Sequence, residues 1–114
     1  MSPSLLDFLN HIHYECTYII TVIKGKSRDE VINNETLCKA IVRSLEIIGE
    51  ATKKIPADLR TKYPSVHWDD MSGMRDVLIH NYFGVDYDIV WNTINNDIPL
   101  LEGQLKQIIQ LEQN

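Results

Sequence analysis

Residues 5–23 read LLDFLNHIHYECTYIITVI, and this stretch decides the fold class. Its apolar side chains recur at steps of 4, 3, 4, 3 and 4 residues, at Leu5, Leu9, Ile12, Cys16, Ile19 and Ile23. An α-helix completes a turn every ~3.6 residues, so this spacing lines these side chains along one helical face. The stretch therefore predicts a long amphipathic helix whose apolar face packs against other helices.

The same spacing predicts three more long helices further along the chain. The expected ranges, the first helix included, are residues 5–23, 35–55, 68–83 and 87–111, with short helical turns after Ser27 and over 57–62. Gly25, Pro56 and Gly84 end the first three, because glycine favours helix C-termini and proline cannot continue a helix. Pro99 is expected to kink the fourth helix, since it removes one backbone donor and crowds the preceding turn. No convincing strand pattern competes, so the predicted fold is an all-α, up-and-down bundle of four principal helices.

The second long helix has a predicted solvent face and a predicted packing glycine. Glu46, Glu50 and Lys54 recur at i, i+4 steps, which suits an exposed face. Gly49 stands without a phosphate-loop pattern around it, so its expected role is close packing against another helix.

Length and composition limit the class of protein further. The chain has 114 residues, 44% of them hydrophobic and 24% charged, as in a single ordinary globular domain. The longest apolar-rich run, Tyr18–Ile23, is far shorter than the ~20 residues that span a bilayer. No Lys or Arg precedes the apolar residues of 1–10, so the start does not resemble a secretory signal and we expect a cytoplasmic protein. Cys16 and Cys38 are then expected to be free thiols, too few for a zinc ribbon.

The net charge of −5 conceals an uneven distribution along the chain. Residues 24–62 hold nine of the eleven Lys and Arg against six acids, whereas residues 63–114 hold two bases against eight acids. The overall charge argues against a general nucleic-acid coat, but the basic middle segment is able to meet phosphates locally. A solvated face is the simpler interpretation of that segment. In the acidic part, Arg75 is the only base between Lys62 and Lys106.

The third expected helix places a charged side chain on its apolar face. On an ideal helix its apolar residues fall in one sector, at Trp68, Met71, Met74, Val77, Leu78 and Ile79. Arg75 and Tyr82 fall inside the same sector, and a guanidinium there is costly unless it is paired or faces a cleft. Asp76 lies one turn before His80, so its carboxylate can hydrogen-bond the imidazole and fix its tautomer. That carboxylate and the nearby helix C-terminus both favour the protonated ring, which suits a proton donor near neutral pH.

Two interpretations of these residues stay open at this point. In the structural one, Arg75 extends from the edge of the core to pair with Asp69 or Asp70. His80 is then a helix cap and Tyr82 a core side chain. In the functional one, an arginine, an aspartate, a histidine and a tyrosine from one helix form a reaction site.

Residues 74–86 read MRDVLIHNYFGVD and resemble the signature of the HepT-like HEPN family. That signature is an arginine, four residues, a histidine, one residue and a tyrosine, with a polar residue usually following the arginine. The matching residues here are Arg75, Asp76, His80 and Tyr82. The stretches 45–53 and 88–101 are also similar to the family, so the likeness covers roughly residues 5–105.

The resemblance implies several properties that helical periodicity does not show. HEPN proteins are small helical bundles that usually dimerise, with the motifs of both chains at one cleft. Many are metal-independent endoribonucleases, and HepT-like members resemble the toxin half of prokaryotic, type VII-like toxin–antitoxin pairs. The partner is a minimal nucleotidyltransferase, the MntA-like antitoxin, which silences the toxin by transferring AMP to the motif tyrosine, here Tyr82. The resemblance therefore implies a homodimeric ribonuclease that needs no cofactor, with tRNA as the implied substrate class.

The residue types of the motif suit this chemistry. Metal-free RNA cleavage needs a base for the 2′-hydroxyl, an acid for the leaving 5′-oxygen and a cation for the charge on phosphorus. Arg75 suits the cationic role and His80 suits proton transfer, with Asp76 orienting the imidazole. One chain offers one motif histidine for two proton transfers, and Arg75 and His80 diverge by ~140° on an ideal helix. A twofold dimer or a distorted helix would resolve both difficulties.

Three alternatives remain from the sequence. The chain is a HEPN module that binds nucleotide or RNA, or assembles with a partner, without catalysis. Alternatively, it is chiefly the acceptor of its partner's nucleotidyl transfer at Tyr82, where AMP adds bulk and negative charge that repel RNA. A metal site at His11 and His13 is disfavoured, because the two side chains lie ~200° apart on one helix.

Overall fold

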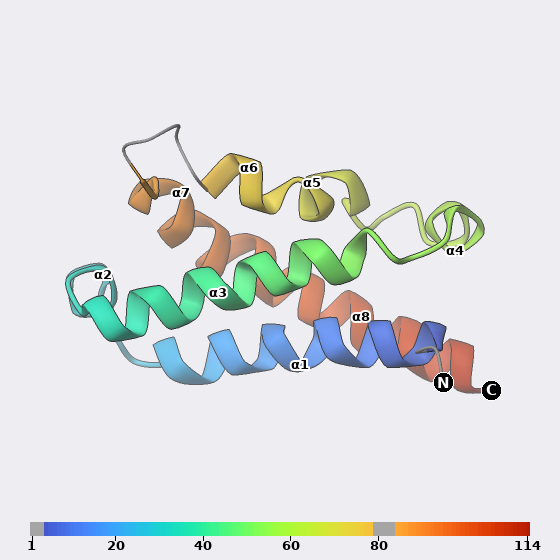
Figure 1. Ribbon diagram of the computed structural model, residues 1–114. Helices are drawn as coiled ribbons and strands as arrows, with labels where there is room; N and C mark the ends of the chain where they lie inside the picture. Colours follow the sequence, from blue (N-terminus) through green and yellow to red (C-terminus); the bar gives the residue numbers. More distant parts are fainter. Residues whose placement is uncertain (1–3, 79–83) are drawn as a thin grey trace.

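The computed structural model describes residues 4–78 and 84–114, and these ranges are helical, without a β-strand (Figure 1). The elements in chain order are α1 (Leu5–Ile23), α2 (Arg28–Ile32), α3 (Glu35–Thr52), α4 (Ala57–Lys62), α5 (Trp68–Ser72), α6 (Met74–Leu78), α7 (Tyr87–Asn92), the π-helical η2 (Thr93–Asp97) and α8 (Ile98–Gln113). The all-α class predicted from the sequence is confirmed. Within the described ranges, no helix combines the length and the apolar character that crossing a membrane requires.

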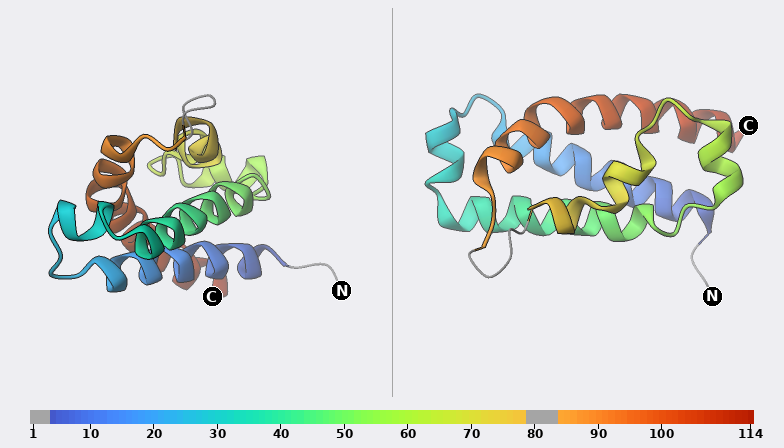
Figure 2. Two further views of the ribbon diagram at one scale, coloured as in Figure 1. Left: turned by 60° about the vertical axis from the view of Figure 1, so that its left-hand side comes forward. Right: turned by 90° about the horizontal axis from the view of Figure 1, so that it is seen from above.

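The long helices α1, α3 and α8 all contribute side chains to one common core. Helix α1 packs against both α3 and α8, and α5 and α6 lie against α3 on the side away from α1 (Figures 1 and 2). The start of α7 contacts α2 and α6, so the end of the bundle near α2 is closed by three short elements. The start of α1 and the end of α8 lie together at the opposite end.

Side chains cap the starts of several helices, and Gly25 follows the first helix as predicted. Ser4 and Ser27 both make capping boxes, at the starts of α1 and α2. The Asn34 side chain accepts from the Leu37 N–H at the start of α3, and Asp86 caps α7 in the same way. Gly25 after α1 has φ +75°, a left-handed conformation that glycine adopts without the steric cost of a side chain.

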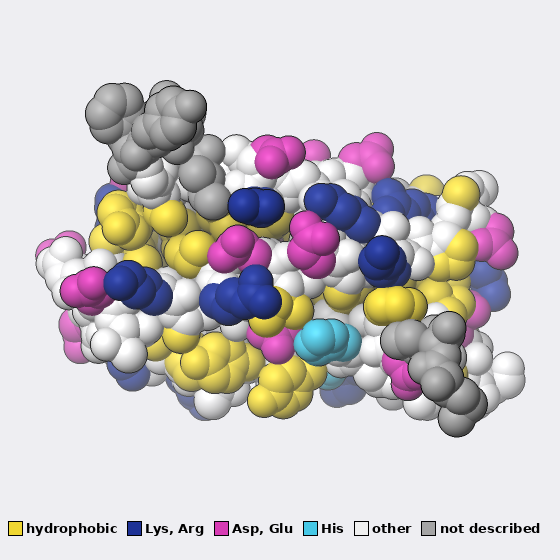
Figure 3. Space-filling view, viewed as in Figure 1, with side chains coloured by type: hydrophobic (Ala, Val, Ile, Leu, Met, Phe, Trp, Pro, Cys, Tyr) yellow, Lys and Arg dark blue, Asp and Glu magenta, His cyan; other side chains and the backbone are white. Residues whose placement is uncertain are grey.

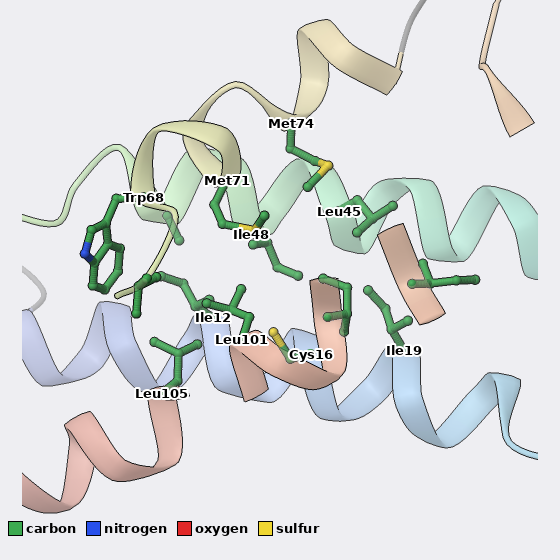
Figure 4. Packing of buried hydrophobic residues seen from close by; sticks show 14 of the residues in the cluster. Ile12, Cys16, Ile19, Leu45, Ile48, Trp68, Met71, Met74, Leu101 and Leu105 are labelled. Atoms are coloured by element: carbon green, nitrogen blue, oxygen red, sulfur yellow. The ribbon is translucent and has the colours of Figure 1, made fainter. Parts of the chain in front are cut away.

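The core is built from the apolar faces of these helices. The side chains of Ile12, Cys16 and Ile19 from α1 meet Leu45 and Ile48 from α3 (Figure 4), and all five are at most 1% exposed. The prediction that Cys16 is a core residue is confirmed, and both cysteines are free and buried.

The fourth predicted helix is interrupted just before Pro99. The Ile98 N–H donates to the Thr93 carbonyl, which makes η2 a π-helical turn, and Pro99 opens the first turn of α8. Proline crowds the carbonyl four residues earlier, which here belongs to Asn95 inside η2. The widened turn therefore falls where the proline crowds the backbone, and the predicted irregularity takes the form of a π segment.

Candidate functional site

The expected helix over residues 68–83 is not continuous in its described part. It is split at Gly73 into α5 and α6, and the prediction of one unbroken helix is wrong there. Glycine has a low helix propensity because it loses more backbone entropy than any other residue. The split lets both short helices lie against α3, with Met71 and Met74 pointing from α5 and α6 into the core (Figure 4).

A glycine on α3 permits this contact. A Cβ atom built on Gly49 would lie 3.1 Å from the Met71 carbonyl oxygen and 3.5 Å from the Met74 Cβ. The backbone of α5 therefore approaches α3 more closely than a side chain would allow. The predicted packing role of Gly49 is confirmed, and this contact fixes the position of the segment that carries Arg75.

Arg75 lies on the surface and not on the core face that the ideal helix predicted. Its side chain is 64% exposed, and Val77, also expected in the core, is 48% exposed. In α6 the buried positions are Met74 and Leu78, one turn apart, so the residues between them point outward. The buried residues Trp68, Met71, Met74 and Leu78 still recur at helical steps of 3, 3 and 4 residues. The buried face is therefore narrower than the broad apolar sector predicted from the sequence, which had included Arg75 and Val77.

Arg75 faces a carboxylate from another helix. Its Nε lies 3.8 Å from a carboxylate oxygen of Glu46 on α3. The sequence offered Asp69 and Asp70 as partners and placed Glu46 on the solvent face, and both expectations are wrong. Asp69 instead lies 3.4 Å from the Arg60 guanidinium, while the Glu46 side chain is only 25% exposed. Helical periodicity held no signal for the pair, because its members come from different helices.

The structure describes one of the three remaining motif residues. Asp76 is exposed on α6, whereas His80 and Tyr82 lie outside the described residues. Leu78 is fully buried, and its carbonyl accepts a 2.8 Å hydrogen bond from the Asp86 N–H. Two residues that flank the motif histidine and tyrosine are thereby joined, and they sit on the same end of the bundle as Arg75.

Basic side chains of the predicted middle segment are exposed on this face beside acids. Figure 3 shows dark blue and magenta side chains alternating over α3 and the short helices above it. The paired groups are Lys39 with Glu35, Lys53 with Glu50, Arg60 with Asp69 and Arg75 with Glu46. Several charges of the segment are therefore balanced by nearby carboxylates, which is consistent with the interpretation of a solvated face.

The two α1 histidines diverge, as predicted. His13 makes a 2.8 Å contact with Glu102 of α8, whereas His11 lies 3.8 Å from Glu15 on its own helix. Among residues 4–78 and 84–114, no three His, Cys, Asp or Glu side chains are grouped so that they could hold a metal ion.

Comparison with known proteins identifies the family. The family model described as "Ribonuclease HepT-like" matches residues 12–108, a range that runs from α1 into α8. The chain belongs to the HepT-like family. The family match includes Arg75, Asp76, His80 and Tyr82, so the resemblance found in the motif extends over the whole bundle.

Relatives in the HepT-like family are named as ribonucleases. A "Putative RNase" of Caldanaerobacter subterraneus subsp. tengcongensis is 50% identical over 105 residues, covering 92% of this chain and 94% of that protein. A "Probable ribonuclease HepT" of Thermococcus cleftensis is 49% identical over 113 residues, covering 95% and 98%. A "Putative RNase" of Methanocaldococcus jannaschii is 49% identical over 92 residues, covering 81% and 76%. No solved structure matches the chain. The HepT-like family and these names support a function of the ribonuclease type.

Proposed function

We propose that this HepT-like protein is a metal-independent endoribonuclease, with tRNA as its substrate class, and that Arg75 binds the phosphate that is cleaved. The observation that carries the proposal is the position of Arg75, which is exposed on α6 with Glu46 at 3.8 Å. This distance is too long for a strong hydrogen bond, so Glu46 orients the guanidinium without occupying the donors that a phosphate would use. A planar guanidinium binds two phosphate oxygens at once, which suits a phosphodiester.

The proposed reaction needs two proton transfers and no redox step. The 2′-hydroxyl loses its proton to a base and attacks phosphorus, and the bond from phosphorus to the 5′-oxygen breaks as an acid protonates that oxygen. The products are a 2′,3′-cyclic phosphate and a 5′-hydroxyl. His80 is the proton-transferring group, Asp76 orients its imidazole, and Arg75 stabilises the negative charge on phosphorus. A homodimer supplies a second His80, so that one imidazole acts as the base and the other as the acid.

The proposal extends to control of this activity by a partner. A minimal nucleotidyltransferase of the MntA type adds AMP to Tyr82 and thereby silences the toxin. The modification places a bulky, negatively charged phosphodiester two residues from His80, where it repels the RNA backbone. What supports this step is the motif tyrosine at position 82 and membership of the HepT-like family.

The test is a cleavage assay on protein made without its partner. After an intact mass shows an unmodified chain, the parent, Arg75→Ala and His80→Ala are incubated with total tRNA in EDTA. Arg43→Ala is the matched control, since Arg43 is also exposed on this bundle but lies on α3 away from the motif. We expect cleavage by the parent and the control, and a loss of about 10²–10³-fold in rate for Arg75→Ala.

Two outcomes would overturn the proposal. Equal cleavage by the parent and His80→Ala would remove His80 from the mechanism. Cleavage that stops in EDTA and returns with a divalent ion would show that the reaction is not metal-independent. Circular dichroism of each variant separates a lost function from a lost fold.

A further inference from the structure

A hollow of about 420 Å³ lies at the corner where α2, α3 and the start of α7 meet. Its lining includes the apolar Ile32, Val42 and Val85 and the polar Asn33, Lys39 and Tyr87. Figure 3 shows hydrophobic surface in this part of the molecule, over the α2 end of α3. The volume falls within the ~300–1,000 Å³ of sites that hold small organic groups, and the mixed lining suits a flat, neutral ring with polar edges.

The hollow adjoins the proposed phosphate site. Glu46 lines it and lies 3.8 Å from Arg75. Val85 also lines it, and the next residue, Asp86, is bonded to the Leu78 carbonyl at the end of α6. Glu46 thus belongs both to the ion pair with Arg75 and to the lining of the hollow. Within the described part of the chain, a nucleotide whose phosphate is held at Arg75 has this hollow beside it as a place for its base.

We propose that the hollow binds one unstacked base of the RNA next to the cleaved phosphate, with the Tyr87 ring as its stacking surface. The inference rests on the proposed ribonuclease function and adds a substrate subsite to it. Tyr87 is 47% exposed at the first position of α7 and lines the hollow, so its ring is accessible to a ligand there. Proteins bind single-stranded RNA by stacking splayed bases on such aromatic side chains.

The charged side chains around the hollow offer different contacts to the base and to its phosphates. Lys39 lies at its rim, paired with Glu35 at 2.9 Å, and offers an ammonium group to a phosphate beyond the base. Glu35 and Glu46 also line the hollow, and their carboxylates accept hydrogen bonds but cannot donate them. The exocyclic amino groups of adenine, cytosine and guanine supply such donors. Uracil has no amino group, and its single donor on that edge, N3–H, lies between two carbonyl oxygens that a carboxylate repels. The subsite therefore favours adenine, cytosine or guanine over uracil.

The proposal is tested by binding of oligonucleotides that cannot be cleaved. Short 2′-O-methyl oligo(A) and oligo(U), whose methyl groups block the attacking hydroxyl, are titrated against the parent, Tyr87→Ala and Tyr87→Phe. Tyr14→Ala is the matched control, because Tyr14 is 64% exposed on α1. We expect Tyr87→Ala to weaken oligo(A) binding about tenfold or more. Tyr87→Phe and Tyr14→Ala should bind as the parent does, and the parent should prefer oligo(A).

The outcomes distinguish this subsite from the reaction itself. Unchanged binding by Tyr87→Ala would overturn the subsite, as would equal binding of oligo(A) and oligo(U) by the parent. The mass of Tyr87→Ala measured by light scattering provides a further check. If this variant loses binding and its mass also falls, Tyr87 contributes to a contact between subunits and the subsite is overturned. If the parent cleaves tRNA and Tyr87→Ala does so with the same KM, the subsite fails and the ribonuclease proposal stands. If the parent binds but does not cleave, and Tyr87→Ala loses binding, the ribonuclease proposal fails and the subsite stands.

Discussion

Replacing Gly49 with alanine tests the contact that positions the motif-bearing segment. In an exposed helix the change from glycine to alanine stabilises by about 0.8–1 kcal/mol, because alanine loses less backbone entropy. At Gly49 the added methyl group would lie 3.1 Å from a backbone oxygen of Met71, which cannot rotate away. Overpacking of this kind costs about 1–3 kcal/mol. The net expectation is a loss of about 0–2 kcal/mol in the free energy of unfolding.

The chain offers a matched control for this change. Gly103 lies exposed within α8, and a Cβ atom added there would meet no described residue within 4 Å beyond its own helix backbone. Gly103→Ala should therefore show the propensity gain alone, about 1 kcal/mol of added stability. The difference between the two variants isolates the packing cost at Gly49, which we expect to be about 1–3 kcal/mol.

Urea and thermal unfolding followed by circular dichroism measure both variants. For a domain of this size, 1 kcal/mol corresponds to about 4 °C in Tm. Gly103→Ala should melt a few degrees higher than the parent, and Gly49→Ala at the same temperature or lower, all at one protein concentration. If Gly49→Ala gains as much stability as Gly103→Ala, the close contact between α3 and α5 does not constrain the fold. RNA cleavage should fall in Gly49→Ala and not in the control, because α6 and Arg75 move with Met71.

Three further predictions concern acid stability, thiol reactivity and the core. Hydrogen bonds from Lys62 and Tyr63 hold the pKa of Glu112 below its usual 4.5. This contact therefore stabilises the fold above pH 4.5, and the stabilisation is lost as the pH falls through the lowered pKa. Glu112→Gln should flatten the acid side of the curve of stability against pH, and an unchanged curve would contradict the prediction. Burial raises the pKa of the Cys16 thiol to about 12, so this thiol is protonated and enclosed at pH 8. Ellman's reagent should react with Cys16 only after urea unfolds the chain. Rapid labelling of Cys16 in the native protein would refute this prediction. Leu78 is fully buried, so Leu78→Ala should lower the free energy of unfolding by about 2–5 kcal/mol, and a loss under 1 kcal/mol would show that its site collapses or is open.

Most of the fold was predictable because its signals are local. The apolar spacing of residues 5–23 and the caps at Ser27, Asn34 and Asp86 each act within a few residues of the chain. The structure places helices at these positions, and the side chains of Ser27, Asn34 and Asp86 cap α2, α3 and α7. The interruption near Pro99 was also expected, because the steric conflict of a proline lies with its own preceding turn.

The candidate site was predictable in its residue types and not in its geometry. The arginine, aspartate, histidine and tyrosine of the motif could be read from residues 74–86. An ideal continuous helix, however, put Arg75 in the core, and the helix is broken at Gly73. Which of the apolar residues of this segment are buried depends on the packing of α5 and α6 against α3, which local spacing does not report.

The helical class, most helix starts and the presence of the motif follow from the amino-acid sequence, because each depends on residues close together in the chain. The exposure of Arg75 and its pairing with Glu46 follow from contacts between helices. Those outcomes depend on Gly49, which lets the backbone at Met71 approach α3, and on the burial of Met74 and Leu78, which leaves Arg75 on the outer side of α6. Close contact between helices distant in sequence therefore sets where the charged groups of the site lie.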